Sequence, residues 1–116
     1  MSHRSPITTH VLDTSRGQPA AGMAVTLWRR DDDEWHNLAA RHTDSDGRIG
    51  DLLAPGSLTA GTYRIRFATA DYFESVGISD YFYPYAEIVF QIDAPDQHYH
   101  VPLLLNPFGY STYRGS

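Results

Sequence analysis

Residues 61–67, which read GTYRIRF, carry the clearest structural signal in the chain. The apolar side chains of Tyr63, Ile65 and Phe67 alternate with polar ones. Successive side chains of a β-strand point to opposite faces, so this alternation predicts a strand with one buried face. The same two-residue period recurs in residues 87–92. Strands of this kind therefore set the fold class.

Other segments rich in β-forming residues are short and are separated by turns that contain Gly, Pro or Asp. We expect further strands over residues 8–13, 24–28, 35–41, 98–105 and 110–114. Several short strands at close spacing are typical of a β-sandwich or barrel. The acidic residues 31–34 then fall at the tip of a hairpin.

One segment departs from the two-residue period. Asp71 is followed three residues later by Glu74, a capping-box pattern, and Gly77 stands where a glycine would end a helix. These features predict one short helix over residues 71–75. The expected fold class is all-β with one short helix, and residues 1–116 have the length of a single domain.

Composition and charge exclude several classes of function. The net charge is −5 with only 9 Lys and Arg and no basic run, so nucleic acid is not an expected partner. The absence of cysteine excludes disulfides, thiolate nucleophiles and Cys-ligated zinc. No apolar run reaches the roughly 18 residues of a membrane span. The first residues lack the apolar core of a signal peptide, so we expect a cytoplasmic protein, or a periplasmic one if a leader was removed.

Histidines are the first candidates for chemistry, with 6 in the chain. His98 and His100 are two residues apart, so they project to the same face of a strand. Such a pair can supply a general base or hold a metal ion, and it can equally be a hydrogen-bonded surface pair. The apolar residues after His100 favour the edge of a buried region, where an imidazole pKa is easily shifted. His10 is open to the same interpretations.

Arg48 follows the turn sequence DSDG at residues 44–47. It is either a solvated charge that pairs with Asp44, Asp46 or Asp51, or a cation directed at a ligand. The turn by itself does not decide between these interpretations. The spacing of an EF-hand calcium loop is absent from this turn.

The chain ends in Tyr113-Arg114-Gly115-Ser116. This tail brings an aromatic ring, a cation and a carboxylate within four residues. Terminal residues usually fray unless something holds them, so the tail is either a frayed strand end or part of a site.

Four motifs considered together resemble a known family. They are TTHVLD (residues 8–13), TDSDGR (43–48), HYHVPLL (98–104) and the terminal YRGS (113–116). In this order they resemble the transthyretin-related 5-hydroxyisourate hydrolase family, and the resemblance covers essentially the whole chain. Transthyretin lacks the terminal motif and the catalytic histidines, so the resemblance is to the enzyme branch.

The resemblance implies a transthyretin-like β-sandwich of two four-stranded sheets with one short helix. It implies a homotetramer, a dimer of dimers, with active sites at the dimer–dimer interface. The implied catalytic residues are His10, Arg48 and His100, and no cofactor or metal is implied. The implied substrate-binding residues are His98, Tyr113, Arg114, Gly115 and Ser116.

The implied reaction belongs to urate (purine) degradation. It hydrolyses the N1–C6 amide bond of 5-hydroxyisourate and yields 2-oxo-4-hydroxy-4-carboxy-5-ureidoimidazoline. An imidazole with a pKa of about 6.5 can activate the water at neutral pH, and an arginine can stabilise the oxyanion. The residues leave open whether His10 or His100 is the base. The alternatives are a non-catalytic transthyretin-like protein that binds a small ligand, and a zinc protein that uses His98 and His100.

Overall fold

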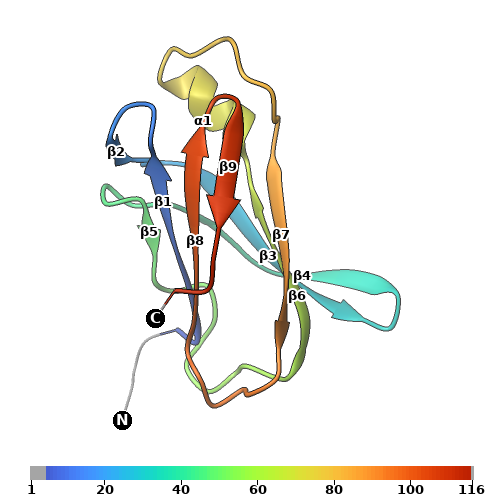
Figure 1. The fold of residues 1–116 in the computed structure, drawn as a ribbon. Helices are drawn as coiled ribbons and strands as arrows, with labels where there is room; N and C mark the ends of the chain where they lie inside the picture. Colours follow the sequence, from blue (N-terminus) through green and yellow to red (C-terminus); the bar gives the residue numbers. More distant parts are fainter. Residues whose placement is uncertain (1–4, 116) are drawn as a thin grey trace.

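Two β-sheets pack face to face, and one short helix lies at one end of the sandwich (Figure 1). The computed structural model describes residues 5–115. The elements in chain order are β1 (Ile7–Asp13), β2 (Gln18–Pro19), β3 (Ala24–Asp31), β4 (Glu34–His42), β5 (Arg48–Ile49), β6 (Gly61–Phe67), α1 (Thr69–Ser75), β7 (Ala86–Ile92), β8 (Tyr99–Asn106) and β9 (Gly109–Thr112).

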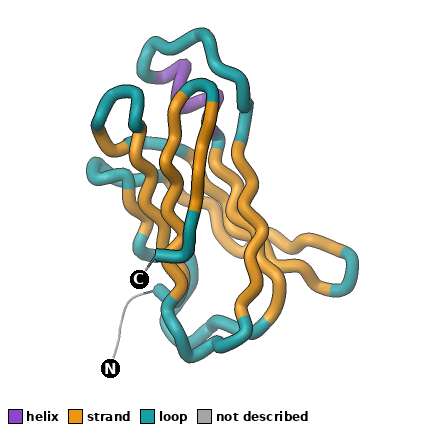
Figure 2. The backbone as a smooth tube through the Cα atoms, viewed as in Figure 1, coloured by secondary structure: helices purple, strands orange, loops and turns teal. Residues whose placement is uncertain are grey.

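The first sheet has the strand order β4-β3-β6-β7, and all of its neighbours are antiparallel. The β3–β4 hairpin extends beyond the other strands, with the acidic turn at its exposed tip (Figure 2). This tip lies where the sequence predicts it.

The second sheet has the order β2-β1-β8-β9, and β5 also pairs with β1. Strands β1 and β8 run parallel, whereas every other pair in this sheet is antiparallel. The predicted sandwich with one short helix is confirmed, but this sheet has five strands where four were expected. Two of them, β2 and β5, are only two residues long, and both lie along β1.

The alternation in β6 has the predicted consequence for packing. Tyr63, Ile65 and Phe67 are at most 1% exposed and pack into the core between the sheets. Burying each such side chain contributes about 1.5–3 kcal/mol to folding. The intervening Arg64 lies on the outer face, where its guanidinium carbon lies 4.5 Å from the centre of the Trp35 ring.

The helix forms, but the predicted capping box is wrong. The helix begins at Thr69, and the N-cap residue Ala68 makes no side-chain cap bond. The N–H of Ala70, in the first turn, instead donates to the carbonyl of Pro84 at 3.0 Å. Asp71 thus lies inside the first turn, where a carboxylate still favours the positive end of the helix dipole.

The predicted glycine at the end of the helix is confirmed. Gly77 has φ +81°, and its N–H bonds to the carbonyl of Glu74. The N–H of Ile78 bonds to the carbonyl of Phe73. These two bonds form a Schellman motif, which needs a left-handed residue at the glycine position.

No helix of the described residues is long and apolar enough to cross a membrane. The cytoplasmic location stays a prediction.

Candidate active site

Three strands of the second sheet meet at the candidate site. In the parallel β1–β8 pair Thr8 lies opposite His100, and in the antiparallel β1–β5 pair His10 lies opposite Arg48. Residues far apart in the sequence are thus placed side by side by the ladder of β1. The site is therefore a product of sheet register, not of any local motif.

The alternation of β1 decides which side chains reach the site. Ile7, Thr9 and Val11 are buried, whereas Thr8 and His10 are half-buried and project to the opposite face. That face is the outer side of the sheet, away from the core. The site therefore opens to the outside of this protomer.

The turn at residues 44–47 fixes the position of Arg48. The Asp44 carboxylate accepts hydrogen bonds from the N–H groups of Asp46 (2.8 Å) and Arg48 (3.0 Å). The bond from the Arg48 N–H is the main reason that the pKa of Asp44 is held below its usual value of 3.8. The turn thereby holds the start of β5 against β1.

Gly47 lets this turn approach β1 closely. It has φ +74°, and a Cβ at this position would collide with the carbonyl oxygen of Val11. The N–H of Val11 donates to the Gly47 carbonyl at 2.8 Å. Glycine is therefore required both by conformation and by space.

The guanidinium of Arg48 is available to a ligand. Arg48 is exposed, and no ion pair between residues 5 and 115 includes it. Of the three aspartates that could have paired with Arg48, Asp51 pairs with Arg41 at 3.4 Å. The carboxylate of Asp44 binds the backbone N–H of Arg48. The solvated ion pair is thus not observed in this part of the chain.

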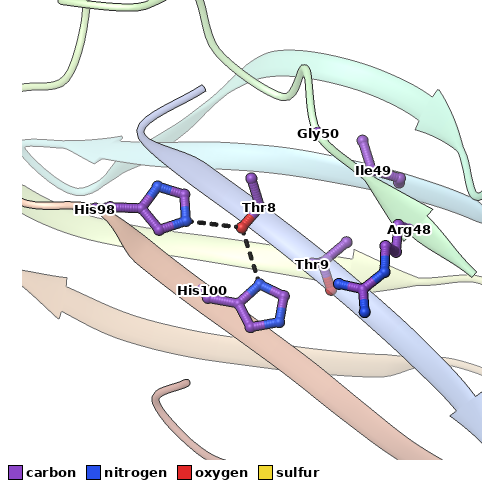
Figure 3. Close-up of a pocket in the computed structure, with 7 residues that line it drawn as sticks. All are labelled: Thr8, Thr9, Arg48, Ile49, Gly50, His98 and His100. Carbon is purple, nitrogen blue, oxygen red and sulfur yellow. Dashed lines mark hydrogen bonds between the residues drawn. The ribbon is translucent and has the colours of Figure 1, made fainter. Parts of the chain in front are cut away.

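The hydroxyl of Thr8 hydrogen bonds to two histidines, His100 on β8 and His98 just before this strand. Thr8 Oγ1 lies 3.0 Å from His98 Nε2 and 2.8 Å from His100 Nδ1 (Figure 3). The other ring nitrogen of His100 points toward the side of the pocket occupied by Arg48. The hydroxyl therefore holds the ring of His100 in one orientation.

The pKa of His100 is lowered from its ordinary value of 6.5. Burial is the main cause, since it disfavours the charged imidazolium. The positive charge of Arg48 adds to the effect, followed by His98 and His10, whereas a hydrogen bond to the Thr8 backbone opposes it. His100 is therefore kept neutral near pH 7, as a general base must be.

The tail reaches this site through its backbone. The N–H of Gly115 donates to the carbonyl of His100 at 2.8 Å, and the two residues form an isolated β-bridge. Tyr113 and Arg114 lie elsewhere in the protomer, in a depression of about 310 Å³ between β7 and β9. There Arg114 stacks on the ring of Tyr99 at 4.4 Å and donates to Gln97 at 2.9 Å. Ser116 lies outside the described residues.

A pocket of about 290 Å³ brings together three of the eight predicted site residues, Arg48, His98 and His100 (Figure 3). It is lined by Thr8, Thr9, Arg48, Ile49, Gly50, His98 and His100. His10 lies beside it, at the register position facing Arg48. The pocket thus presents an exposed cation beside a neutral imidazole, which suits hydrolysis of a bond that develops negative charge. No group of three or more His, Cys, Asp or Glu that could hold a metal occurs within residues 5–115.

The predicted set omits two residues. Thr8 is two positions before His10, so the strand period already places both on one face. The sequence suggests Asp44 only as a partner for the side chain of Arg48, whereas its carboxylate binds the backbone N–H of Arg48. An Asp four residues before the functional arginine in a turn sequence is the available signal, because Asp side chains commonly accept bonds from nearby N–H groups.

Comparisons with known proteins identify the family and the relatives of this chain. Residues 7–115 match the model of the HIUase/Transthyretin family. The chain is 47% identical to 5-hydroxyisourate hydrolase 2 of Rhizobium meliloti (strain 1021), and the alignment covers 100% of both chains. Among solved structures, the 5-hydroxyisourate hydrolase of Klebsiella pneumoniae has a TM-score of 0.81 at 39% identity, covering 95% of this chain and 92% of that one.

Transthyretin from Sparus aurata is also similar in structure. Its TM-score is 0.88 at 33% identity, and the match covers 95% of this chain and 96% of that one. The family model and the enzyme from Rhizobium meliloti each span most or all of the chain. The chain therefore belongs to the HIUase/Transthyretin family.

Proposed function

We propose that this protein hydrolyses 5-hydroxyisourate, as the names of its relatives from Rhizobium meliloti and Klebsiella pneumoniae describe for those proteins. The observation that carries the proposal is the pairing of an open guanidinium, Arg48, with the neutral imidazole of His100 in one pocket. A cyclic amide needs both a base for water and a cation for the oxyanion.

His100 is the general base in this proposal. Its Nδ1 is held by Thr8, and its other ring nitrogen faces the pocket. A water bound there loses a proton to Nε2 as its oxygen attacks C6 of the substrate. The lowered pKa keeps the nitrogen lone pair available at neutral pH.

Arg48 stabilises the tetrahedral oxyanion. Its planar donor fork can bind two oxygens at once, and its exposed position leaves these donors for the substrate. The N1–C6 bond then breaks, and the leaving nitrogen receives the proton. His10, which lies opposite Arg48, orients the substrate or shares this proton transfer.

The tail completes the site in an assembly of four copies. Within one protomer Gly115 alone of the described tail residues touches His100, while Tyr113 and Arg114 face the depression between β7 and β9. We propose a homotetramer, a dimer of dimers, in which the tail of residues 113–116 closes the outward-facing pocket. Light scattering on the purified protein measures the assembly directly.

The decisive experiment generates 5-hydroxyisourate with urate oxidase and follows its ultraviolet absorbance. The protein should accelerate the decay beyond the spontaneous rate. His10→Asn, Arg48→Ala and His100→Asn should each lower kcat/KM by about 100-fold or more. His36→Asn is the matched control, because His36 is exposed on β4 of the other sheet.

Two outcomes would contradict the proposal. An unchanged decay rate would favour a non-catalytic binding protein, which displacement of a hydrophobic phenol would then reveal. Near-full turnover by Arg48→Ala would show that the guanidinium of Arg48 does not stabilise the oxyanion. A bulky C-terminal extension should also lower turnover, since it displaces the tail from His100.

A further inference from the structure

The hydroxyl of Thr8 is the only described side chain within residues 5–115 that hydrogen bonds to both His98 and His100. A threonine hydroxyl carries one proton and two lone pairs. It can therefore donate to only one of the two ring nitrogens, and the other nitrogen can join the bridge only by donating its own proton. The two rings cannot choose their tautomers independently.

This restriction leaves two arrangements of the neutral bridge. In one, His98 Nε2–H donates to Thr8 and the hydroxyl donates to His100 Nδ1, so both rings carry their protons on Nε2. In the other, His100 Nδ1–H donates to Thr8 and the hydroxyl donates to His98 Nε2, so both rings carry their protons on Nδ1. Only the second arrangement leaves His100 Nε2 with a lone pair toward the pocket.

We propose that Thr8 is a proton-relay residue that couples the tautomers of His98 and His100. The inference deepens the proposed function and rests on it in one respect, the role of His100 as the base. It assigns His98 a role at the far end of a three-group chain, in place of direct contact with the substrate.

The relay moves protons without any co-reactant. As water gives a proton to His100 Nε2, His100 Nδ1 gives its proton to Thr8 Oγ1, and Thr8 gives its own proton to His98 Nε2. His98 then carries the positive charge, His100 is neutral again, and the hydroxide has attacked the carbonyl carbon. The reverse transfer returns a proton through Thr8 to His100, whose Nε2–H protonates the leaving nitrogen.

The charges around the site explain why a relay is useful. Burial disfavours a positive charge on His100 most, followed by Arg48, His98 and His10. A relay removes the developing charge from this ring to His98, one hydrogen bond further from the guanidinium. The mechanism thus leaves Arg48 to stabilise the substrate oxyanion and avoids a lasting positive charge on His100 beside it.

Nitrogen NMR of the ring nitrogens tests the coupling without substrate. Above the pKa of the rings, the wild-type protein should show both His98 and His100 protonated on Nδ1, the tautomer that free histidine disfavours. Thr8→Val keeps the shape but removes the hydroxyl, and His100 should then revert toward the Nε2–H form. Thr8→Ser should retain the wild-type tautomers. Thr62→Val is the control, since its hydroxyl bonds to Gln91 on the other sheet.

The kinetic arm uses mixtures of light and heavy water. Wild-type kcat should show a curved proton inventory, which indicates more than one proton in flight, and Thr8→Val should show a linear one with kcat lower by about 10-fold or more. Thr8→Ser should restore both the rate and the curvature. A purely structural role would alter the rate but not the curvature.

The two arms separate the failure of the relay from the failure of the proposed function. An Nε2–H tautomer of His100 in the wild-type protein would overturn the relay even if the enzyme is active. A linear wild-type inventory would also overturn it. If the protein shows no activity at all, the proposed function fails, and the NMR arm still decides whether Thr8 couples the two rings. If Thr8→Val does not fold, the wild-type spectrum and Thr8→Ser carry the test.

Discussion

Gly115 lies so close to the ring of His100 that a side chain at this position would have to displace the ring. A Cβ built on Gly115 would be 2.6 Å from His100 Cδ2 and 3.3 Å from Cγ. The backbone bond from Gly115 to the His100 carbonyl fixes this approach. The C-terminal tail therefore sets the position of an imidazole that belongs to another strand.

Gly115→Ala should displace the ring of His100 and lower kcat by about 10- to 100-fold, because a shift of about 1 Å in a catalytic group is that costly. Steady-state kinetics on 5-hydroxyisourate measure the loss. Gly109→Ala is the matched control, since its Cβ would meet only the Asn106 side chain at ordinary contact distances of 3.7 and 3.8 Å. Equal activity of the two variants would show that the contact does not position His100.

The lowered pKa of His100 predicts the acidic limb of the pH profile. A base with a pKa below 6.5 is still mostly unprotonated at pH 6.5, so kcat/KM should decline at a lower pH than an ordinary histidine base would give. Arg48→Gln removes a neighbouring positive charge and should raise the pKa of His100, which proton NMR titration measures directly. Arg41→Gln, which removes an exposed cation outside the pocket, should leave the titration unchanged. A His100 that titrates above 6.5 in the wild type would contradict the assignment of burial as the dominant cause.

Asp44 should be needed for the placement of Arg48. Asp44→Ala removes the acceptor for the N–H groups of Asp46 and Arg48, so the start of β5 should loosen and KM should rise by several-fold. Asp46→Ala removes the same charge from the same turn but leaves these two acceptor bonds in place. If both variants raise KM equally, the effect is one of charge and not of turn geometry.

The phenol of Tyr72 should matter for stability and not for turnover. Its O–H donates to the fully buried Asp13 carboxylate at 2.7 Å and accepts from Arg16 at 3.1 Å. Tyr72→Phe leaves that carboxylate short of a donor and should lower the free energy of unfolding by about 1–3 kcal/mol in urea titration. Tyr81→Phe removes a more exposed phenol, which donates to Glu74, and should have a smaller effect. A change in kcat with Tyr72→Phe would be inconsistent with this role.

The fold was largely predictable because periodicity is local information. The alternation of residues 61–67 and 87–92 reports which side chains are buried, and both segments are strands in the structure. The two-residue strands β2 and β5 were not predictable in this way, since their pairing depends on where β1 lies. The start of α1 is not predictable for a related reason, because the carbonyl of Pro84, which is distant in the sequence, takes the place of a side-chain cap for the N–H of Ala70.

The site was only partly predictable. The shared face of His98 and His100 follows from their spacing, but nothing local shows that Arg48 lies opposite His10, or that Thr8 bridges the histidines. Those relations depend on strand register, which residue patterns do not specify between distant segments. The resemblance to the family predicted that these residues act together. The pairing of β1 with β5 and with β8 explains physically why they meet.

The parallel pairing of β1 with β8 also has a consequence for how the molecule becomes active. Thr8 and His100 are 92 residues apart, so their contact closes nearly the longest loop that this chain can form. Contacts of such separation are slow to form and depend on most of the intervening structure. During synthesis His98 and His100 emerge only after the elements from β1 to β7 have been made. The appearance of turnover would thus mark the last stage of folding, and a nascent chain would reach its full fold before it could touch its substrate.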